Sequence, residues 1–377
     1  MRTAIRLSFG VLALTTMAAC GSGGGAAAPS GSAAPGKITV AASDTECKVA
    51  ASEVTAGTTT FSITNGGSKV TEFYVYAPGD RVMAELENIV PGLTRELIAE
   101  LPAGAYETVC KPGMIGKGIR NALKVTGEHK ALNEDAKLAE AVAGYKRYIK
   151  AQSDTLLVKT QEFVDAVKAE KVDKAKELYP VARTYWERIE PVAEIFGNLD
   201  PAIDAREADL ADGEEWTGFH KIEKDLWIKK DVSKDGPIAD KLIADVKTIV
   251  DKSNAAELTP LNLANGAKEL LDEVATGKIT GEEDIWSHTD LWDFDANLEG
   301  SKAAVQALRP VLEERAPDLV KTLDQKFAAA EAALDAHQKG DGWKLHNELS
   351  KAELKTLSDA INALAEPISK IAPSVAK

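Results

Sequence analysis

The spacing of apolar residues changes sharply near residue 128, and this change limits the folds open to the chain. Over residues 38–127, short segments rich in β-branched and aromatic residues partly alternate polar and apolar positions, which is typical of strands. From residue 128 onward, apolar residues recur at helical spacing, and Gly and Pro stand mostly at the breaks. We therefore predict a multidomain protein, in which a small all-β sandwich over 38–127 precedes an all-α helical bundle over 128–377.

The N-terminus has the pattern of an export signal. Two arginines precede the apolar stretch Leu7–Ala19, which is too short to span a bilayer but suits a secretory signal. The tetrapeptide Met17–Cys20 resembles a bacterial lipobox, with an ordinary cleavage site as the alternative. We predict a signal peptide over 1–19 and lipidation of Cys20, which would leave an exported protein anchored to the cell membrane on its extracytoplasmic, or periplasmic, face.

Residues 20–37 form a predicted linker behind this anchor. They are rich in Gly, Ala, Ser and Pro and carry almost no charge, so they cannot bury a core and should act as a flexible tether. Two acyl chains, as a diacylglyceryl group supplies, are enough for stable anchoring. The sequence therefore predicts a folded protein held near a membrane by a tether.

The charge balance excludes one class of partner. The chain has 45 Lys and Arg against 59 Asp and Glu, which gives a formal net charge of −14. Such a surface repels phosphate backbones, so we expect no nucleic-acid binding. The same negative field attracts metal cations.

One helical segment carries a histidine and a glutamate at metal-ligand spacing. His220 and Glu223 are three residues apart, so they project from the same helix face. Among five histidines in an acidic chain, one His-x-x-Glu also arises readily by chance. The motif gains weight from the two tryptophans, Trp216 and Trp227, that frame it.

Two nearby segments add carboxylates. Glu187 and Glu190 stand one turn apart just before Pro191, which should kink or end their helix; a solvated helix face is the alternative interpretation. Asp204 lies one turn into a short predicted helix. Together with His220 these groups offer mostly oxygen donors and one imidazole, an inventory that suits hard cations, including Fe(III).

Four segments of the helical region resemble one known domain, and the β-rich part before it extends that resemblance. The helical region resembles the imelysin domain, and residues 38–377 as a whole resemble the EfeO-type family of iron-uptake lipoproteins from EfeUOB-type systems. The segments that carry the resemblance are RTYWERIEPVAEIF, DPAIDAREADL, EEWTGFHKIEKDLW and WSHTDLWDFDANLEGSKAAVQALRPVL.

The resemblance implies a cupredoxin-like domain followed by a bilobed helical bundle that binds ferrous or ferric iron for a membrane permease. It also implies a haem peroxidase as a partner, and we expect the protein itself to be a monomer. Carried over by position, the iron ligands in the bundle are Glu187, Glu190, Asp204, His220 and Glu223. The expected role is capture of iron rather than catalysis.

The predicted β domain poses a separate question about metals. Residues 38–127 contain no histidine, which excludes a standard blue-copper centre. The loop from Cys110 to Met114 resembles the cysteine-to-methionine loop of cupredoxins, and Glu72 stands where such folds place their first histidine. With Cys47, these residues could bind copper or a second metal; a disulfide between Cys47 and Cys110 is the alternative in an oxidising compartment. A ferroxidase or electron-shuttling role for this domain stays open.

Other functions and the remaining histidines complete the expectations. A metallopeptidase is disfavoured because the chain lacks His-Glu-x-x-His, and a lipoprotein that binds an anionic polysaccharide or another solute is a further alternative. We expect His288 to be structural or to support metal ligands from outside. His337 and His346 lie in helical surface patterns, so we expect them to be solvated.

Overall fold

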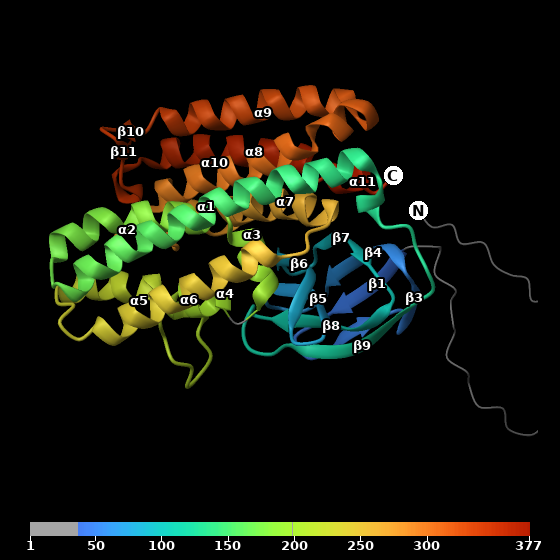
Figure 1. Cartoon of the computed structure of the whole chain (residues 1–377), viewed down its shortest axis with the longest axis horizontal. Helices are drawn as coiled ribbons and strands as arrows, with labels where there is room; N and C mark the ends of the chain where they lie inside the picture. The colour runs from blue at the N-terminus through green and yellow to red at the C-terminus, as the bar shows by residue number, and fades with distance from the viewer. Residues whose placement is uncertain (1–36, 198) are drawn as a thin grey trace, which may run out of the picture. The chain divides into compact units, whose positions relative to one another are not determined.

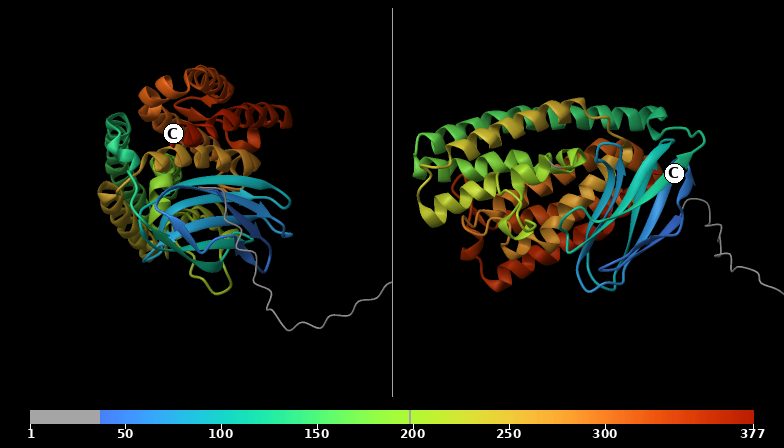
Figure 2. Two further views of the ribbon diagram at one scale, coloured as in Figure 1. Left: turned by 90° about the vertical axis from the view of Figure 1, so that its right-hand side faces the viewer. Right: turned by 90° about the horizontal axis from the view of Figure 1, so that it is seen from below.

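The computed structural model describes residues 37–197 and 199–377, which belong to one compact unit (Figures 1 and 2). The predicted signal peptide, the lipidated Cys20 and most of the predicted linker lie outside the described residues. Within the described part of the chain, no helix is long and apolar enough to cross a membrane.

The first part is a β-sandwich, as the strand pattern predicts. One sheet has the order β2-β1-β4-β7 and the other the order β3-β9-β8-β5-β6. Most neighbours are antiparallel, but β1 runs parallel to β4, and β3 runs parallel to β9. The strands are β1 (Lys37–Ala42), β2 (Cys47–Val49), β3 (Glu53–Thr55), β4 (Gly57–Asn65), β5 (Thr71–Ala77), β6 (Arg81–Ile89), β7 (Thr94–Leu101), β8 (Gly104–Pro112) and β9 (Ile119–Thr126).

Alternating burial along the strands creates the core between the two sheets. Every second residue of β1 is buried, which is the period that a half-buried strand requires. Phe61 of one sheet and Phe73 of the other are fully buried, and their ring centroids are 5.3 Å apart. A disulfide between Cys47 of β2 and Cys110 of β8 also joins the sheets.

The rest of the described chain is helical, as its apolar spacing predicts. In Figure 1, α9 packs along α8 and α10, and α1 packs along α2 and α6. The helices are α1 (Ala136–Lys168), α2 (Val172–Glu187), α3 (Glu190–Ala193), α4 (Leu199–Asp204), α5 (Phe219–Lys224), α6 (Gly236–Ala255), α7 (Pro260–Thr276), α8 (Asp290–Arg315), α9 (Pro317–Asp335), α10 (Lys351–Ile368) and α11 (Ile371–Val375). The short helical turns are η1 (Leu132–Glu134), η2 (Glu194–Phe196), η3 (Glu207–Asp209), η4 (Asp225–Lys229), η5 (Lys278–Thr280) and η6 (His346–Glu348).

Local signals in the sequence set several helix ends. Asp135 caps α1 by accepting hydrogen bonds from the backbone N–H groups of Lys137 and Leu138. Ser350 and Glu353 form a capping box at the start of α10. The helix α2 ends at Glu187, before Pro191, as the proline predicts.

The helical region also contains a short hairpin that the sequence analysis does not predict. Strands β10 (Gln338–Lys339) and β11 (Gly342–Trp343) pair across a turn in which Gly340 has a φ of 66°. The expectation that His337 and His346 are solvated is wrong, since they are only 5% and 9% exposed. His346 lies in η6 with its Nε2 atom 3.0 Å from the carbonyl oxygen of Ile279, a contact across 67 residues that helical spacing alone could not reveal.

The β-sandwich contacts the helical region mainly through β6, β7 and α7. Arg95 of β7 forms an ion pair with Asp272 of α7, and the side-chain amide of Asn265 donates to the backbone carbonyl of Ile98 over 3.0 Å. A cavity of about 420 Å³ lies at this junction. The acidic residues lining it come from both parts: Glu72, Asp80, Glu85, Glu87, Glu190, Glu194, Asp200, Asp204, Asp209, Glu214, Glu273, Glu282 and Glu283.

Candidate metal centre

A close approach between α4 and α5 brings Asp204 and His220 together. Gly218, directly before α5, has φ 88° and ψ −165°, a conformation that is essentially restricted to glycine. A Cβ atom at this position would lie only 2.1 Å from the backbone oxygen of Ile203, so the absent side chain is what permits the approach. The hydroxyl of Thr217 donates to the carbonyl of Ala202 over 2.8 Å and fixes the contact.

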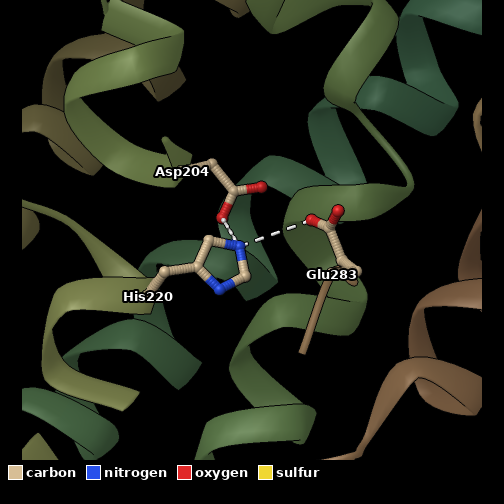
Figure 3. Close-up of side chains that lie close together, drawn as sticks. All are labelled: Asp204, His220 and Glu283. Atoms are coloured by element: carbon tan, nitrogen blue, oxygen red, sulfur yellow. Dashed lines mark ion pairs between the residues drawn. The ribbon is translucent and has the colours of Figure 1, made fainter. Parts of the chain in front are cut away.

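His220 is completely buried, and its Nε2 atom faces two carboxylates (Figure 3). Nε2 is 3.4 Å from Asp204 Oδ1 and 3.4 Å from Glu283 Oε1. It has no hydrogen-bond partner with adequate geometry among the described residues. Ligand atoms in adjacent positions around one ion, with bonds of about 2.1 Å, lie roughly 3 Å apart, so these three groups need only a small inward shift to share a cation.

The other ring nitrogen of His220, Nδ1, contacts a carboxylate and a hydroxyl on the opposite side of the ring. Nδ1 is 3.1 Å from Glu223 Oε2 and 3.2 Å from the Tyr179 hydroxyl. The second oxygen of Glu223 accepts from the backbone N–H groups of Trp286 and Ser287, over 3.1 and 2.7 Å. Glu223 therefore orients the ring and points Nε2 at the two carboxylates, where a bound cation would replace its proton; this is the usual division of roles around a metal-bound histidine.

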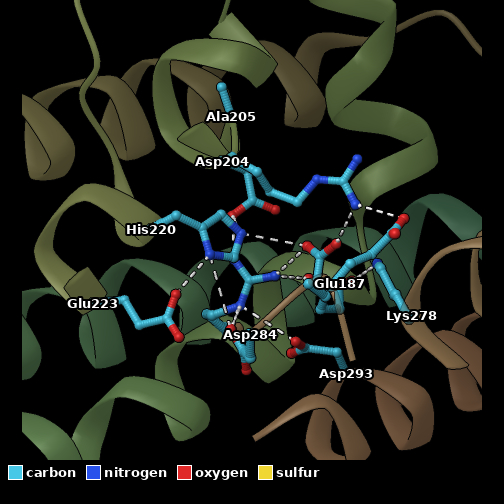
Figure 4. Close-up of polar contacts among 12 residues, drawn as sticks. Glu187, Asp204, Ala205, His220, Glu223, Lys278, Asp284 and Asp293 are labelled. Atoms are coloured by element: carbon cyan, nitrogen blue, oxygen red, sulfur yellow. Dashed lines mark hydrogen bonds and ion pairs between the residues drawn. The ribbon is translucent and has the colours of Figure 1, made fainter. Parts of the chain in front are cut away.

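Arg183 is the buried counter-charge of this cluster. Its guanidinium, fully buried on α2, forms ion pairs with Glu187, Asp204 and Glu283. It also lies 3.4 Å from Asp293 and 3.5 Å from Asp284, two carboxylates that are labelled in Figure 4. The same oxygens of Asp204 and Glu283 that face His220 also contact Arg183, so a bound cation would compete with the guanidinium.

Glu187 and Glu190 belong to a neighbouring cluster built around Lys278. The two oxygens of Glu187 contact Arg183 and Lys278, so both are already paired. Glu190 lies 3.3 Å from the Lys278 ammonium, and Glu273 lies 2.9 Å from it. Of the five ligands that the sequence suggests, the structure thus brings Asp204, His220 and Glu223 into direct contact and joins Glu187 and Glu190 to them through buried cations.

The surroundings of His220 favour its charged form. Burial and the nearby Arg183 lower its pKa, but the carboxylates of Asp204, Glu223 and Glu283 outweigh them and raise the pKa to about 10. For the Asp293 carboxyl, burial has the opposite effect and raises the pKa well above its usual range, although Arg183 opposes this. The centre therefore has more carboxylates than its own cations neutralise, and extra positive charge would stabilise it.

Sequence reasoning missed Glu283, Asp284, Arg183 and Lys278. Glu283 and Asp284 stand in an acidic run that resembles a solvated turn, yet they are 7% and 0% exposed. Arg183 is four residues before Glu187, so helical spacing could have placed these two on one face. Nothing local indicates that Lys278 turns inward.

The β-sandwich does not offer the thiolate ligands that the sequence left open. Because Cys47 and Cys110 form a disulfide, neither can act as a thiolate ligand. Of the four candidate residues, Glu72 and Met114 remain, and both line the cavity. Glu72 is 4% exposed and lies 3.5 Å from Lys111. One carboxylate and one thioether, without histidine or thiolate, do not fit a cupredoxin copper centre.

His288 lies outside the group of side chains around His220. Its backbone is strained, with a φ of 60°, and its N–H donates to the carbonyl of Asp284 over 2.7 Å. Its own carbonyl accepts from the N–H of His346. These bonds hold the loop that presents Glu283 and Asp284, which fits a structural role.

Family models and known proteins match nearly the whole chain. The imelysin model matches residues 141–371, and a cupredoxin-like domain model matches residues 10–119. These matches confirm the resemblance that the sequence segments suggest.

Two curated relatives extend the comparison. The "iron uptake system component EfeO" of Escherichia coli O157:H7 is 37% identical over 342 residues, which cover 89% of this chain and 90% of that protein. An "Efem/EfeO family lipoprotein" of Staphylococcus haemolyticus is 44% identical over 253 residues, covering 65% of this chain and 85% of that protein. A solved structure, a putative iron-regulated protein A precursor from Parabacteroides distasonis, is 12% identical with a TM-score of 0.47 and covers 66% of this chain and 97% of that one.

Proposed function

The chain belongs to the EfeO family of imelysin-domain iron uptake components, and from this premise we propose that it captures iron at the centre formed by Asp204, His220 and Glu283. The relatives named above are described as an iron uptake component and as a lipoprotein. In this proposal the ion is cargo that the protein holds outside the membrane and then releases.

One observation supports this proposal more than any other. His220 Nε2 is completely buried, lacks a hydrogen-bond partner within the described chain, and faces two carboxylate oxygens at 3.4 Å each. A buried polar atom without a partner carries a cost, and a cation bound by Nε2 would remove it. One imidazole and two carboxylates are a ligand set that iron accepts readily.

The other predicted ligands take supporting roles. Glu223 fixes the ring of His220, while Glu187 and Glu190 hold Arg183 and Lys278 near the centre. Asp204 and Glu283 line the cavity, so an ion that enters it reaches both oxygens. As the ion binds, the guanidinium of Arg183 loses part of its contact with them, and its movement back offers a route to release.

Family membership supports a proposal for the place and partners of the protein. We propose that a lipid on Cys20 and the linker over 20–37 hold it at the extracytoplasmic face of the membrane. There it would pass iron to a membrane permease, with a haem peroxidase as a further component. Ferrous and ferric iron both suit the ligand set, and protonation, reduction or contact with the permease would loosen it.

Iron titration of matched histidine variants tests the proposal. We expect His220→Gln to lower iron affinity by about tenfold or more, because it removes the only nitrogen ligand. His337→Gln is the matched control, since that ring is also buried but lies beside Glu353, at 3.7 Å. Ferrous iron is titrated without oxygen and ferric iron as its citrate complex, and bound iron is measured by equilibrium dialysis.

The two variants also separate loss of a ligand from loss of the fold. Circular dichroism and the urea midpoint of each variant show whether it folds. Equal iron affinity of folded His220→Gln, His337→Gln and the unmodified protein would remove the proposed site.

A further inference from the structure

Five glutamates from three elements meet at the junction of the β-sandwich and the helices. Glu85 and Glu87 come from β6, Glu194 from η2, and Glu269 and Glu273 from α7. A carboxylate oxygen of Glu194 lies within 4.8 Å of oxygens from Glu85 and Glu269. Glu194 also lies within this distance of Glu87 and Glu273. The five side chains therefore form one group with Glu194 at its centre, and none of them contacts His220.

Several oxygens in this group have no partner. Glu85 is only 6% exposed and lines the cavity, yet its carboxylate forms no hydrogen bond or ion pair with any described residue. One oxygen of Glu194 and one of Glu273 are buried without a hydrogen-bond partner in the same part of the chain. Buried carboxylates without a donor or cation are costly, so this arrangement indicates a ligand.

The nearby cations of the protein pair mainly with carboxylates outside this group. Arg95 and Lys268 both pair with Asp272, and Lys278 pairs with Glu273 and Glu187. Within residues 37–197 and 199–377, four of the five glutamates have no ion pair: Glu85, Glu87, Glu194 and Glu269. The group therefore holds more carboxylates than the cations of the described chain pair with.

The donor set selects the kind of ion. All five residues offer oxygen only, with no nitrogen or sulfur, and hard cations such as Ca²⁺, Mg²⁺, Mn²⁺ and Fe³⁺ prefer such sites. We propose that Glu85, Glu194 and Glu269, supported by Glu87 and Glu273, form a second, all-carboxylate site for a hard cation. The bound ion joins β6 of the sandwich to η2 and α7 of the helical region. This site is independent of the proposed iron centre, because it shares no ligand with it.

Binding of Mn²⁺ tests the proposal, since this ion accepts oxygen ligands and its free form is measured directly by electron paramagnetic resonance. We expect two bound Mn²⁺ per chain when both sites take the ion. The double variant Glu85→Gln/Glu194→Gln should lose one of them, and His220→Gln should lose the other. The control Glu177→Gln/Glu366→Gln changes two exposed carboxylates and should bind as the unmodified protein does.

The pattern of loss distinguishes the two sites. If the iron centre fails but the second site holds, the unmodified protein binds one Mn²⁺ and Glu85→Gln/Glu194→Gln binds none. If Glu85→Gln/Glu194→Gln binds Mn²⁺ as the unmodified protein does, the second site does not exist.

A measurement on the unmodified protein covers the case in which the double variant does not fold. Crystals soaked in Mn²⁺ should show an anomalous peak among Glu85, Glu194 and Glu269, and its absence would overturn the proposal. Competition by Ca²⁺, Mg²⁺ or ferric citrate against bound Mn²⁺ then identifies which hard cation the site prefers.

Discussion

Arg183 is completely buried among carboxylates that come from α2, α4, α8 and the loop before α8. Such a guanidinium neutralises part of the charge that the metal ligands bring together. It also keeps Asp204 and Glu283 in place when no ion is bound. The residue is thus a stabilising group and, in the proposed function, a competitor of the bound ion.

Replacement of this guanidinium should destabilise the metal-free protein strongly. We expect Arg183→Met to lower the free energy of unfolding by about 3–5 kcal/mol, because it leaves buried carboxylates without their cation. Urea denaturation measures the change. Arg188→Met, at an ion pair with the half-exposed Glu299, should cost about 1 kcal/mol or less. Equal costs would show that Arg183 is not the counter-charge of the centre.

His220 should carry a positive charge at neutral pH in the metal-free protein. In the metal-free protein its pKa should be about 10, so nitrogen-15 shifts of its ring should stay those of an imidazolium from pH 6 to 8.5. Because the folded-state pKa lies above the unfolded value of about 6.5, the attraction between the imidazolium and the surrounding carboxylates stabilises the fold fully below pH 6.5. The stabilisation then declines as the pH rises to about 10. A titration midpoint of the His220 ring near pH 6.5 would contradict the proposed effect of the surrounding carboxylates.

Single residues show where sequence reasoning succeeds and where it stops. His220 and Glu223 are recognisable because helical spacing alone places them on one face. Glu283 and Asp284 are not recognisable, because they lie in a loop more than 60 residues after His220 in the sequence. Only tertiary packing buries this loop beside the histidine. Residues that only tertiary packing brings together leave no periodic signal.

At the scale of elements, the short helices α4 and α5 determine the geometry of the centre. Each contributes one ligand, Asp204 at the end of α4 and His220 near the start of α5. Their separation depends on Gly218, where a side chain would collide with the backbone of Ile203.

We expect Gly218→Ala to destabilise the protein by about 3 kcal/mol or more and to weaken iron binding, because it combines a strained backbone with this collision. Gly213→Ala is the matched control: its φ is also positive, at 86°, but no atom lies within 4 Å of the added Cβ. The control should cost about 1–2 kcal/mol and leave iron binding unchanged. Thermal unfolding and iron titration measure both effects, and equal iron affinity of the two variants would refute the role of Gly218.

The disulfide is a second feature at this scale, since it links β2 of one sheet to β8 of the other. Alkylation should label Cys47 and Cys110 only after reduction, as peptide mass spectrometry can show. Replacement of both by Ala should cost about 2–4 kcal/mol in the free energy of unfolding. Free thiols in the exported protein would contradict this and reopen the thiolate alternative.

Local signals predicted most elements correctly. Alternation predicted the sandwich, and Pro191 predicted the end of α2. The hairpin of β10 and β11 was missed, because each strand has only two residues, too few for any periodic pattern. His337 and His346 were misplaced for the same reason.

At the scale of the whole molecule, the sandwich and the helices share an acidic cavity. The order of a β domain before a helical bundle was predictable from periodicity. The meeting of Glu72, Glu85 and Glu87 with Asp204 and Glu283 around one cavity was not, because it depends on how β6 packs against α7 and η2. The first part of the chain thus contributes carboxylates to the same cavity that Asp204 and Glu283 line.

Crystals of the protein loaded with iron, with diffraction data collected on both sides of the iron absorption edge, would locate the bound ion and so test the proposed iron centre. We expect an anomalous peak within bonding distance of His220 Nε2, Asp204 and Glu283. The guanidinium of Arg183 should lie further from both carboxylates than it does without iron. An iron peak bonded to other residues, with His220 Nε2 still unligated, would contradict it.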